Sequence, residues 1–343
     1  MTAIRTVLVT GGAGFIGSNF IRYVLQTEPR VHVTNLDALT YAGNLASLVQ
    51  VADDPRYRFE HGDVCDPEQV DRLMADVDAV VHFAAESHVD RSIDGPAEFL
   101  RTNVLGSGVV FEAARRHGIE RCLHISTDEV YGSIDAPGSF TETDPLVPNS
   151  PYSASKAGAD LLARSYAQTY DYPIMVTRTT NNFGPYHHPE KVIPLFITRL
   201  IDGQTVPLYG DGSNVRDWTF VDDNAAAQWL VLTQGTPGEV YNVGAGNELS
   251  NKELTYAILE RFGFDGEAAD QRIEFVADRP GHDLRYSVTT DKIRALGWAP
   301  THSFEEGLDA TVAWYRDNEA WWRPLAARGA TIRRGSLPTS HTS

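Results

Sequence analysis

Short apolar runs rich in β-branched residues alternate with longer amphipathic stretches over the first half of the chain. The runs are VLVT (7–10), VHVTNL (31–36), YRFEHG (57–62), AVVHFAA (79–85), CLHIST (122–127) and IMVTRT (174–179). This alternation is typical of βαβ units around a parallel sheet that is covered on both faces. The pattern therefore predicts an α/β fold with a Rossmann-type doubly wound parallel sheet over residues 1–180.

The regular alternation ends after Asn181, where prolines and glycines mark loops and turns. The segment DWTFVDDNAAAQWLVLTQ (217–234) has a helical pattern that could return to the first domain, so we assign about 218–244 to that domain. Residues 181–217 and 245–328 are expected to form a smaller mixed α/β lobe that binds a substrate. Residues 331–343 contain little that could pack, and we expect them to form a disordered tail.

Composition adds limits on function. The 343 residues suggest about two domains, and the formal charge of −17 would repel long polyanions, which argues against nucleic-acid binding. Cys65 and Cys122 are too few for a disulfide framework and suit a reducing compartment. The chain also lacks the pattern of a secretory signal and any long apolar run. We therefore expect a cytoplasmic protein that does not interact with membranes.

A glycine motif follows the first predicted strand. Gly12-x-Gly14-x-x-Gly17 directly follows VLVT and opens a helical pattern, and Asp37 lies at the end of the second strand. Glycines at these positions let a pyrophosphate approach the amides of a helix N-terminus, and an acid in the place of Asp37 can bind a ribose 2′-hydroxyl. The motif alone could be only a turn, but with Asp37 it favours NAD over NADP. After the third strand, Asp63 and Val64 could flank the adenine, or Asp63 could simply cap a helix.

A tyrosine and a lysine lie four residues apart behind a helix-start signal. Asn149, Ser150 and Pro151 predict the beginning of a helix, which would place Tyr152 and Lys156 on one face. We expect the ammonium to lower the pKa of the phenol toward neutrality, so that Tyr152 removes a hydroxyl proton while NAD takes a hydride from the same carbon. This spacing also occurs by chance. Its significance is greater here because the chain contains only four lysines.

Two adjacent carboxylates follow the fifth predicted strand, at the sheet edge where ligands of open α/β folds bind. These are Asp128 and Glu129, directly after Thr127. One reading is a helix-capping aspartate beside a solvated glutamate. The other is an acid and base pair whose unequal environments hold the two groups in different protonation states.

Several segments together resemble the dTDP-glucose 4,6-dehydratases of the extended short-chain dehydrogenase/reductase family. They are the glycine segment, LDALTYAGNL, FAAESHVDRSI, STDEVYG, YSASK, TRTTNNFGPYHHPEKVIPLFI, PLYGDGSNVRDWTFVDD and DRPGHDLRYSV, in order from about Arg5 to Trp298. The glycine motif and Tyr-x-x-x-Lys are shared with sugar epimerases. The Thr127-Asp128-Glu129 sequence is more specific, because epimerases typically lack the acid pair.

The resemblance implies a role for each catalytic group. Tyr152, assisted by Lys156 and Thr127, would take the C4 hydroxyl proton as the C4 hydride passes to NAD. Glu129 would then remove the C5 proton while protonated Asp128 delivers a proton to the departing C6 hydroxyl, and the hydride would return to C6. The implied cofactor is NAD and the implied substrate is dTDP-glucose.

The resemblance also implies binding residues and an assembly. The cofactor residues would be Gly11, Gly14, Phe15, Ile16, Gly17, Asp37, Ala38, Leu39, Thr40, Asp63, Val64, Phe83, Ala84, Ala85, Ser87, Thr102, Tyr152, Lys156 and Asn182. The substrate residues would be Ser87, Thr127, Asn181, Lys191, Val192, Pro207, Leu208, Tyr209, Arg216, Asn251, Arg279, His282 and Tyr286. A homodimer is expected, packed through the apolar faces of residues 97–116 and 152–170.

Some residues allow a second reading. Arg216 could grip a diphosphate bidentately, or form an ion pair with Asp217 or Asp222. The histidines at 82, 88, 124, 187 and 188 lack the spacing of a metal site, so no metal is expected. The Trp321-Trp322 pair is expected to pack in a core and not to form a sugar platform.

Two rival functions follow from the same residues. One is dehydration or 4-epimerisation of another nucleotide sugar, linked to UDP or GDP, because simple spacing does not identify the base. The other is a non-catalytic NAD-sensing protein. The presence of Tyr152, Lys156, Asp128 and Glu129 together argues against a sensor, which has no need for all four.

Overall fold

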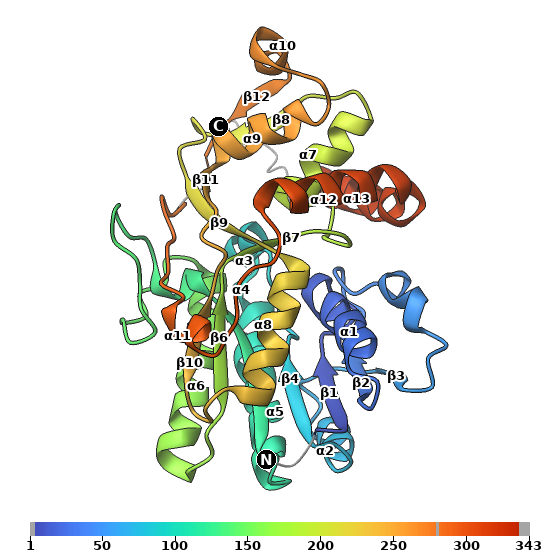
Figure 1. Cartoon of the computed structure of the whole chain (residues 1–343), viewed down its shortest axis with the longest axis vertical. Helices are drawn as coiled ribbons and strands as arrows, with labels where there is room; N and C mark the ends of the chain where they lie inside the picture. Colours follow the sequence, from blue (N-terminus) through green and yellow to red (C-terminus); the bar gives the residue numbers. More distant parts are fainter. Residues whose placement is uncertain (1–3, 279–280, 336–343) are drawn as a thin grey trace, which may run out of the picture.

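The computed structural model describes residues 4–278 and 281–335, and a seven-stranded parallel sheet forms its centre (Figure 1). The strand order is β10-β6-β5-β4-β1-β2-β3, which confirms the predicted Rossmann-type sheet. The strands are β1 (Thr6–Thr10), β2 (His32–Asp37), β3 (Tyr57–His61), β4 (Ala79–His82), β5 (Arg121–Thr127), β6 (Met175–Thr179) and β10 (Val240–Val243). The order reverses between β1 and β4, which is where such sheets bind ligands.

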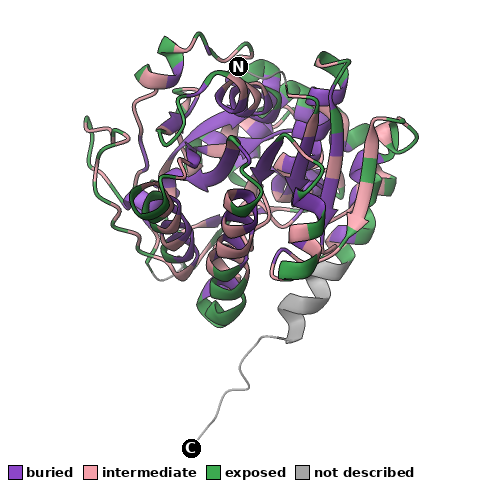
Figure 2. Ribbon diagram, turned by 90° about the horizontal axis from the view of Figure 1, so that it is seen from below, coloured by how far each residue is buried: buried purple, intermediate pink, exposed green. Residues whose placement is uncertain are grey.

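Helices cover both faces of this sheet. On one face, Val7 and Val9 of β1 share a core cluster with Phe20 of α1 (Phe15–Thr27) and Val231 of α8 (Val221–Gln234). On the other face, Leu8 packs in a cluster contributed by α2 (Pro67–Met74), α5 (Ser107–Arg116) and α6 (Pro151–Tyr170). Figure 2 shows the buried residues concentrated in the strands and on the inner sides of the helices.

Shorter elements connect these layers. They are the 3₁₀ turns η1 (Leu45–Val51) and η3 (Asp128–Tyr131), the helices α3 (Val89–Asp94) and α4 (Pro96–Phe99), and the π-helical turn η2 (Leu100–Gly106). Helix α3 follows β4, and η3 follows β5. Both therefore lie at the carboxyl edge of the sheet, where they can contribute to a ligand site.

A smaller lobe lies beyond the carboxyl edge of the sheet (Figure 1). Its core includes Phe183, Phe196, Trp218, Leu308 and Tyr315. Three strands form one small sheet in the order β11-β9-β7, and two more pair as β12-β8. The elements are β7 (Asn181–Phe183), α7 (Val192–Ile201), β8 (Val206–Tyr209), β9 (Val215–Phe220), β11 (Glu248–Ser250), α9 (Asn251–Glu260), α10 (Gly266–Asp270), β12 (Ile273–Val276), α12 (Phe304–Asp317) and α13 (Glu319–Gly335).

The structure differs from the predicted element boundaries in three places. Residues 217–220 form the end of β9 and not the start of a helix, because Trp218 and Phe220 are buried in the core of the lobe. Ile293 of α11 (Asp291–Ala295) and Trp298, in the range assigned to the lobe, are buried in the core beside α8. Helix α13 continues to Gly335, into the expected tail, and residues 336–343 lie outside the described residues.

Within residues 4–278 and 281–335, no helix combines the length and the apolar character needed to cross a membrane.

Candidate active site

One cavity of about 740 Å³ lies between the carboxyl edge of the parallel sheet and the smaller lobe. Most of the predicted ligand-binding residues line it. From the predicted cofactor set these are Gly11, Gly14, Phe15, Ile16, Gly17, Asp37, Ala38, Thr40, Asp63, Val64, Phe83, Ala84, Ala85, Ser87, Thr102, Tyr152, Lys156 and Asn182. From the predicted substrate set they are Ser87, Thr127, Asn181, Lys191, Val192, Pro207, Leu208, Tyr209, Arg216, Asn251 and His282.

Three predicted residues are placed differently. Leu39 is not among the lining residues, but its backbone N–H donates to Asp37 Oδ1 at 2.8 Å. Tyr286 is buried behind Arg216, whose guanidinium lies 4.1 Å above the tyrosine ring. Arg279 lies outside the described residues. Leu39 and Tyr286 therefore support lining groups from behind.

The glycine loop is closely packed at the start of α1. Gly11 has a φ of +72°, and a Cβ there would lie 2.6 Å from Ala84 N. At Gly17 a Cβ would lie 2.4 Å from Gly11 O. Helix α1 begins at Phe15 after the Gly14 N-cap, which carries no side chain to satisfy the first amides. The first backbone amides of the helix are therefore not capped by a side chain, and they can bind an anion that enters the cavity.

Asp37 is held beside this loop by two backbone groups. Its Oδ2 accepts a hydrogen bond from Ala13 N at 2.8 Å, and Oδ1 accepts the bond from Leu39 N. Burial raises the pKa of this carboxyl above its ordinary value, and the two hydrogen bonds offset only part of the rise. Each oxygen keeps a lone pair for a hydroxyl group, which is the chemistry expected toward a ribose.

Asp63 lines the cavity and does not cap a helix. Asp66, and not Asp63, caps helix α2, because its carboxylate accepts from Glu68 N and Gln69 N. Asp63 forms an ion pair with Arg101 at 2.6 Å and lines the cavity beside Val64. The glycine loop, Asp37 and Asp63 thus form one continuous cradle along the cavity, and these residues fit NAD: the amides at the start of α1 would hold its pyrophosphate, and Asp37 and Asp63 would hold its adenosine.

Thr127 ends β5 and organises the acid pair. Its hydroxyl accepts a hydrogen bond from Glu129 N at 3.3 Å and donates to Asp128 Oδ1 at 3.2 Å. Asp128 is buried, and among the described residues its Oδ2 has no hydrogen-bond partner. Burial, together with the charge of Glu129, raises the pKa of Asp128 to about 8. Asp128 is therefore protonated near neutral pH and available as a proton donor in the cavity.

Tyr152 and Lys156 lie in the first turns of α6, which begins as predicted at Pro151. Ser150 caps the helix, since its hydroxyl accepts from Ser153 N at 3.0 Å. Lys156 Nζ donates to Ile125 O at 2.7 Å, and burial lowers the pKa of this ammonium to about 8. Both side chains line the cavity, so α6 and the β5–η3 junction place their functional groups in one site.

The expected direction of the Tyr152 pKa is wrong. Burial, assisted by the charges of Glu129 and Asp128, raises the pKa of this phenol instead of lowering it toward neutrality. A hydrogen bond with Thr127 opposes the rise without reversing it. The reason is that a phenolate loses hydration on burial and faces two carboxyl groups, effects that spacing along a helix does not reveal.

At the other end of the cavity, Arg216 is almost completely buried on β9. Its guanidinium donates to the carbonyl groups of Val215 at 2.6 Å and Asp283 at 2.8 Å. Asp217, one of the alternative partners, instead accepts from Asn247 N at 2.7 Å. Arg216 is thus fixed by backbone carbonyls and by the Tyr286 ring in the wall of the cavity.

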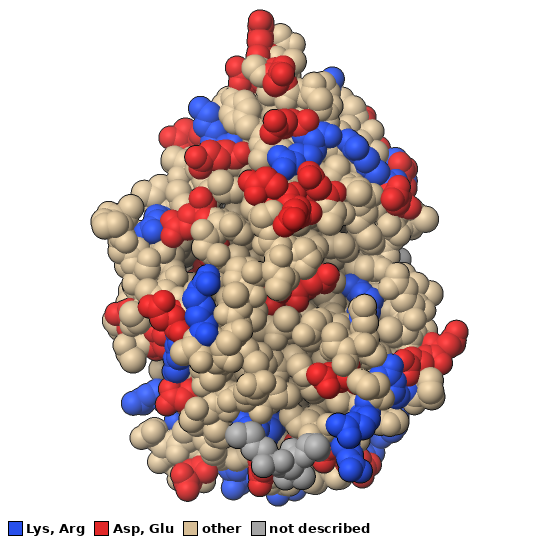
Figure 3. Space-filling model, in the orientation of Figure 1, with Lys and Arg blue, Asp and Glu red and all other residues tan. Residues whose placement is uncertain are grey.

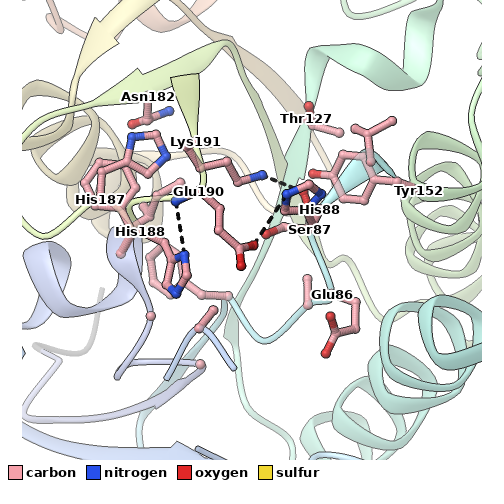
Figure 4. Close-up of a pocket in the computed structure, with 18 of the residues that line it drawn as sticks. Glu86, Ser87, His88, Thr127, Tyr152, Asn182, His187, His188, Glu190 and Lys191 are labelled. Carbon is pink, nitrogen blue, oxygen red and sulfur yellow. Dashed lines mark hydrogen bonds and ion pairs between the residues drawn. The ribbon is translucent and has the colours of Figure 1, made fainter. Parts of the chain in front are cut away.

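Several lining residues were not assigned a role from the sequence. Figure 4 shows Glu86, His88, His187, His188 and Glu190 around the same cavity as Tyr152 and Lys191. Most of them lie in the segments that carry the family resemblance. Their position within those motifs is the feature of the sequence that could have predicted a place in the cavity. Trp321 of α13 also lines the cavity while packing on Trp314, and no local pattern indicates that contact.

The chain is similar to known enzymes over most of its length. The family model described as GDP-mannose 4,6 dehydratase matches residues 8–311. The low-salt glycan biosynthesis protein Agl12 of Haloferax volcanii is 58% identical over 309 residues, covering 90% of this chain and 98% of that protein. The dTDP-glucose 4,6-dehydratase of Streptomyces antibioticus is 53% identical over 341 residues, covering 97% of this chain and 99% of its own length.

Solved structures of nucleotide-sugar enzymes share the fold of this chain. The dTDP-glucose 4,6-dehydratase DesIV of Streptomyces venezuelae, crystallised with NAD bound, has a TM-score of 0.90 and 55% identity, covering 93% of this chain and 99% of its own. The UDP-glucose 4-epimerase of Thermotoga maritima has a TM-score of 0.83 at 30% identity, covering 92% and 99%. The fold is therefore shared by enzymes with different reactions, and the site residues must distinguish them.

Proposed function

Because the chain belongs to the nucleotide-sugar 4,6-dehydratases of the extended short-chain dehydrogenase/reductase family, we propose that it is a dTDP-glucose 4,6-dehydratase. It converts dTDP-glucose to dTDP-4-dehydro-6-deoxyglucose and water. The observation that carries the proposal is the adjacent pair of buried Asp128 and partly buried Glu129, which lines the same cavity as Tyr152 and Lys156. The high pKa of Asp128 supports its role as an acid.

The residues divide the reaction into proton transfers. Tyr152 takes the proton of the C4 hydroxyl as C4 is oxidised to a ketone, with the ammonium of Lys156 stabilising the phenolate. NAD, held by the glycine loop and Asp37, would supply the hydride acceptor for the oxidation at C4 and the hydride donor for the reduction at C6, and its positive charge would favour the Tyr152 phenolate. Thr127, through its hydrogen bond with Tyr152, orients the phenol.

Elimination uses the acid pair. The C4 ketone makes the C5 hydrogen acidic, and Glu129 removes it as a proton. Asp128 donates its proton to the C6 hydroxyl, which leaves as water and creates a C5–C6 double bond. After reduction at C6, a proton returns to C5 from Glu129. Tyr152 ends the cycle with one proton more and Asp128 with one proton fewer, so a proton passes from Tyr152 to Asp128 to restore the site, and the net change is the loss of one water.

The substrate's two phosphates require positive charge at the far end of the cavity. Arg216 and Lys191 line the cavity and supply this charge, while Pro207, Leu208 and Tyr209 of β8 line the cavity and would contact the base. His282 pairs with Asp278 at 2.7 Å beside Tyr209, which adds a polar group near the base. Asn181 and Asn251 offer amides for sugar and phosphate oxygens.

A substrate panel tests the assignment. Purified protein is incubated with dTDP-, UDP- and GDP-linked hexoses without added NAD, and products are identified by mass and by the keto group. We expect a 4-keto-6-deoxy product from dTDP-glucose. A 4-epimer, or turnover only with a UDP or GDP sugar, would replace the proposal by its nearest rivals.

The acid pair is tested by Glu129→Gln. This variant keeps Tyr152 and Lys156 and so should still oxidise C4, seen as accumulation of bound NADH, while elimination slows by about 10²- to 10⁴-fold. Glu120→Gln is a matched control, since Glu120 is exposed and lies just before β5, at the end of the strand opposite to Glu129. Normal turnover by Glu129→Gln would remove Glu129 from the role of C5 base.

The chain also carries a surface suited to self-association. Leu100 and Leu105 on η2 and Leu161 on α6 are each more than half exposed, and apolar residues of η2, α5 and α6 line a groove between them. We infer a homodimer through this face, in line with a two-fold interface in which one patch meets itself. The free thiols of Cys65 and Cys122 fit our proposal of a cytoplasmic location.

A further inference from the structure

Three loops from distant parts of the sequence meet at Arg91, the third residue of α3. Its guanidinium donates to both carboxylate oxygens of Glu190, at 2.8 and 2.9 Å, and stacks 3.8 Å above the Tyr41 ring. His88 Nε2 lies 3.5 Å from Glu190 Oε2 (Figure 4). We call Tyr41, His88, Arg91 and Glu190 the Arg91 clasp.

The clasp is more than an exposed ion pair. The side chains of Glu190 and Arg91 are only 10% and 27% exposed, and one guanidinium nitrogen, Nη2, donates charge-assisted hydrogen bonds to both carboxylate oxygens. Tyr41 covers one face of the guanidinium and thereby shields the pair from water. A half-exposed pair on the surface would contribute little.

The clasp joins both ends of the proposed site. Tyr41 belongs to the loop after β2 that also contains Ala38, Leu39 and Thr40, the expected cofactor residues. Glu190 directly precedes Lys191, whose Nζ donates to Ser87 O at 2.9 Å. Tyr41, His88 and Glu190 line the cavity, whereas Arg91 does not. Arg91 thus holds a cofactor loop and a substrate loop together from outside.

Helix α3 is also attached to the catalytic helix. The hydroxyl of Ser92, the residue after Arg91, accepts a hydrogen bond from Tyr152 N at 3.1 Å. A single short helix therefore contacts the loop of Glu190 on one side and the first turn of α6 on the other. The hydrogen bond between Ser92 and Tyr152 N anchors α3 to α6, and α3 in turn restrains the Glu190 loop through Arg91.

We propose that Arg91 is a positioning residue, and that its pairing with Glu190 keeps the cavity closed so that the cofactor stays bound through the whole reaction cycle. The inference rests on the proposed function, in which one cofactor molecule serves both the oxidation at C4 and the reduction at C6. Loss of the cofactor between these steps would leave the sugar oxidised and the enzyme inactive. A clasp between the cofactor loop and the substrate loop opposes that loss.

The test compares Arg91→Met with Arg56→Met. Arg56 makes a bidentate pair with Asp54, is similarly exposed at 22%, and does not line the cavity. The measurement is the rate at which bound NAD or NADH leaves the protein, followed by the fluorescence of NADH and by cofactor content after desalting. We expect Arg91→Met to release cofactor about tenfold faster than wild type, and Arg56→Met to release it at the wild-type rate.

Activity provides a second readout. Wild type should turn over without added NAD, whereas Arg91→Met should lose activity on desalting and regain it when NAD is added. Arg56→Met should keep its activity after desalting without added NAD. Glu190→Gln, which keeps the size of the side chain, should release cofactor faster in the same way and remains informative if Arg91→Met folds poorly.

The outcomes separate the two proposals. Cofactor release at the wild-type rate in both Arg91→Met and Glu190→Gln would overturn the clasp, whatever the substrate is. Faster release from these variants, with no dehydration of dTDP-glucose by wild type, would support the clasp and overturn the proposed reaction.

Discussion

Burial moves the pKa values of Asp128 and Lys156 in opposite directions, and both end near 8. An apolar environment disfavours the charged form of each group, so the carboxyl keeps its proton longer and the ammonium loses its proton sooner. Near neutral pH the site therefore holds a protonated acid and a charged lysine together. That combination is the one required for elimination after oxidation.

The pH dependence of turnover follows from these two groups. As pH rises through about 8, Asp128 loses the proton that it must donate and Lys156 loses the charge that stabilises the Tyr152 phenolate. Both changes lower the rate, so kcat should fall on the alkaline side. The measurement is kcat against pH at saturating substrate, and a rate that still rises well above pH 8 would contradict both assignments.

At the scale of elements, helix α6 carries three functional groups at intervals of four residues. Asp160 follows Tyr152 and Lys156, is buried, and forms an ion pair with Arg178 of β6 at 2.8 Å. Its negative charge raises the pKa of Lys156 against the effect of burial. The helix therefore supplies both the lysine and part of the field that keeps it charged.

Asp160→Asn should separate this effect from simple packing. Removing the carboxylate lowers the pKa of Lys156 further, so the alkaline fall in kcat should move to lower pH. Stability should fall by about 3 kcal/mol or more, because Arg178 is left with an unpaired buried charge. Asp171→Asn, at the exposed left-handed end of the same helix, should change neither the pH profile nor the stability. An unshifted profile in Asp160→Asn would exclude the electrostatic role.

The glycine loop before α1 depends on backbone packing. In Gly17→Ala the added Cβ would meet Gly11 O at 2.4 Å and Gly12 Cα at 2.8 Å, both backbone atoms that cannot move aside alone. We expect a loss of about 1–3 kcal/mol in the free energy of unfolding and weaker NAD retention. Gly95→Ala is the control, since its nearest neighbour is Arg91 O at 3.9 Å. Thermal unfolding and cofactor content measure the two effects, and NAD content equal to wild type in Gly17→Ala would count against the cradle.

For the whole molecule, the charge of −17 opposes both proposed ligands, which are anions. Figure 3 shows acidic side chains at the tip of the smaller lobe, over α10, and basic side chains mixed with acidic ones elsewhere on that face. Binding must therefore depend on local groups. These are the amides at the start of α1 for one pyrophosphate, and Arg216 with Lys191 for the other.

The oligomeric state of the protein can be tested by mutation of its exposed apolar face. Leu105→Glu combined with Leu161→Glu places charges on the exposed apolar face of η2 and α6, and should convert a dimer to a monomer in light scattering. Val49→Glu, on an exposed apolar position of η1, should leave the mass unchanged. A wild-type monomer would show that this face does not pair with itself.

The sequence by itself determined the parallel sheet and the start of α6, because these depend on local periodicity and capping, while most of the residues that line the cavity were predicted from the family resemblance of its motifs. It did not determine the direction of the Tyr152 pKa, since desolvation and the nearby carboxyl groups arise only on folding. Nor did it reveal that Arg101 pairs with Asp63, that Trp321 reaches the cavity, or that Ile293 and Trp298 return to the main core. The sequence likewise did not reveal the Arg91 clasp. Its residues are up to 149 positions apart, as Tyr41 and Glu190 show, and only the tertiary structure brings them into contact.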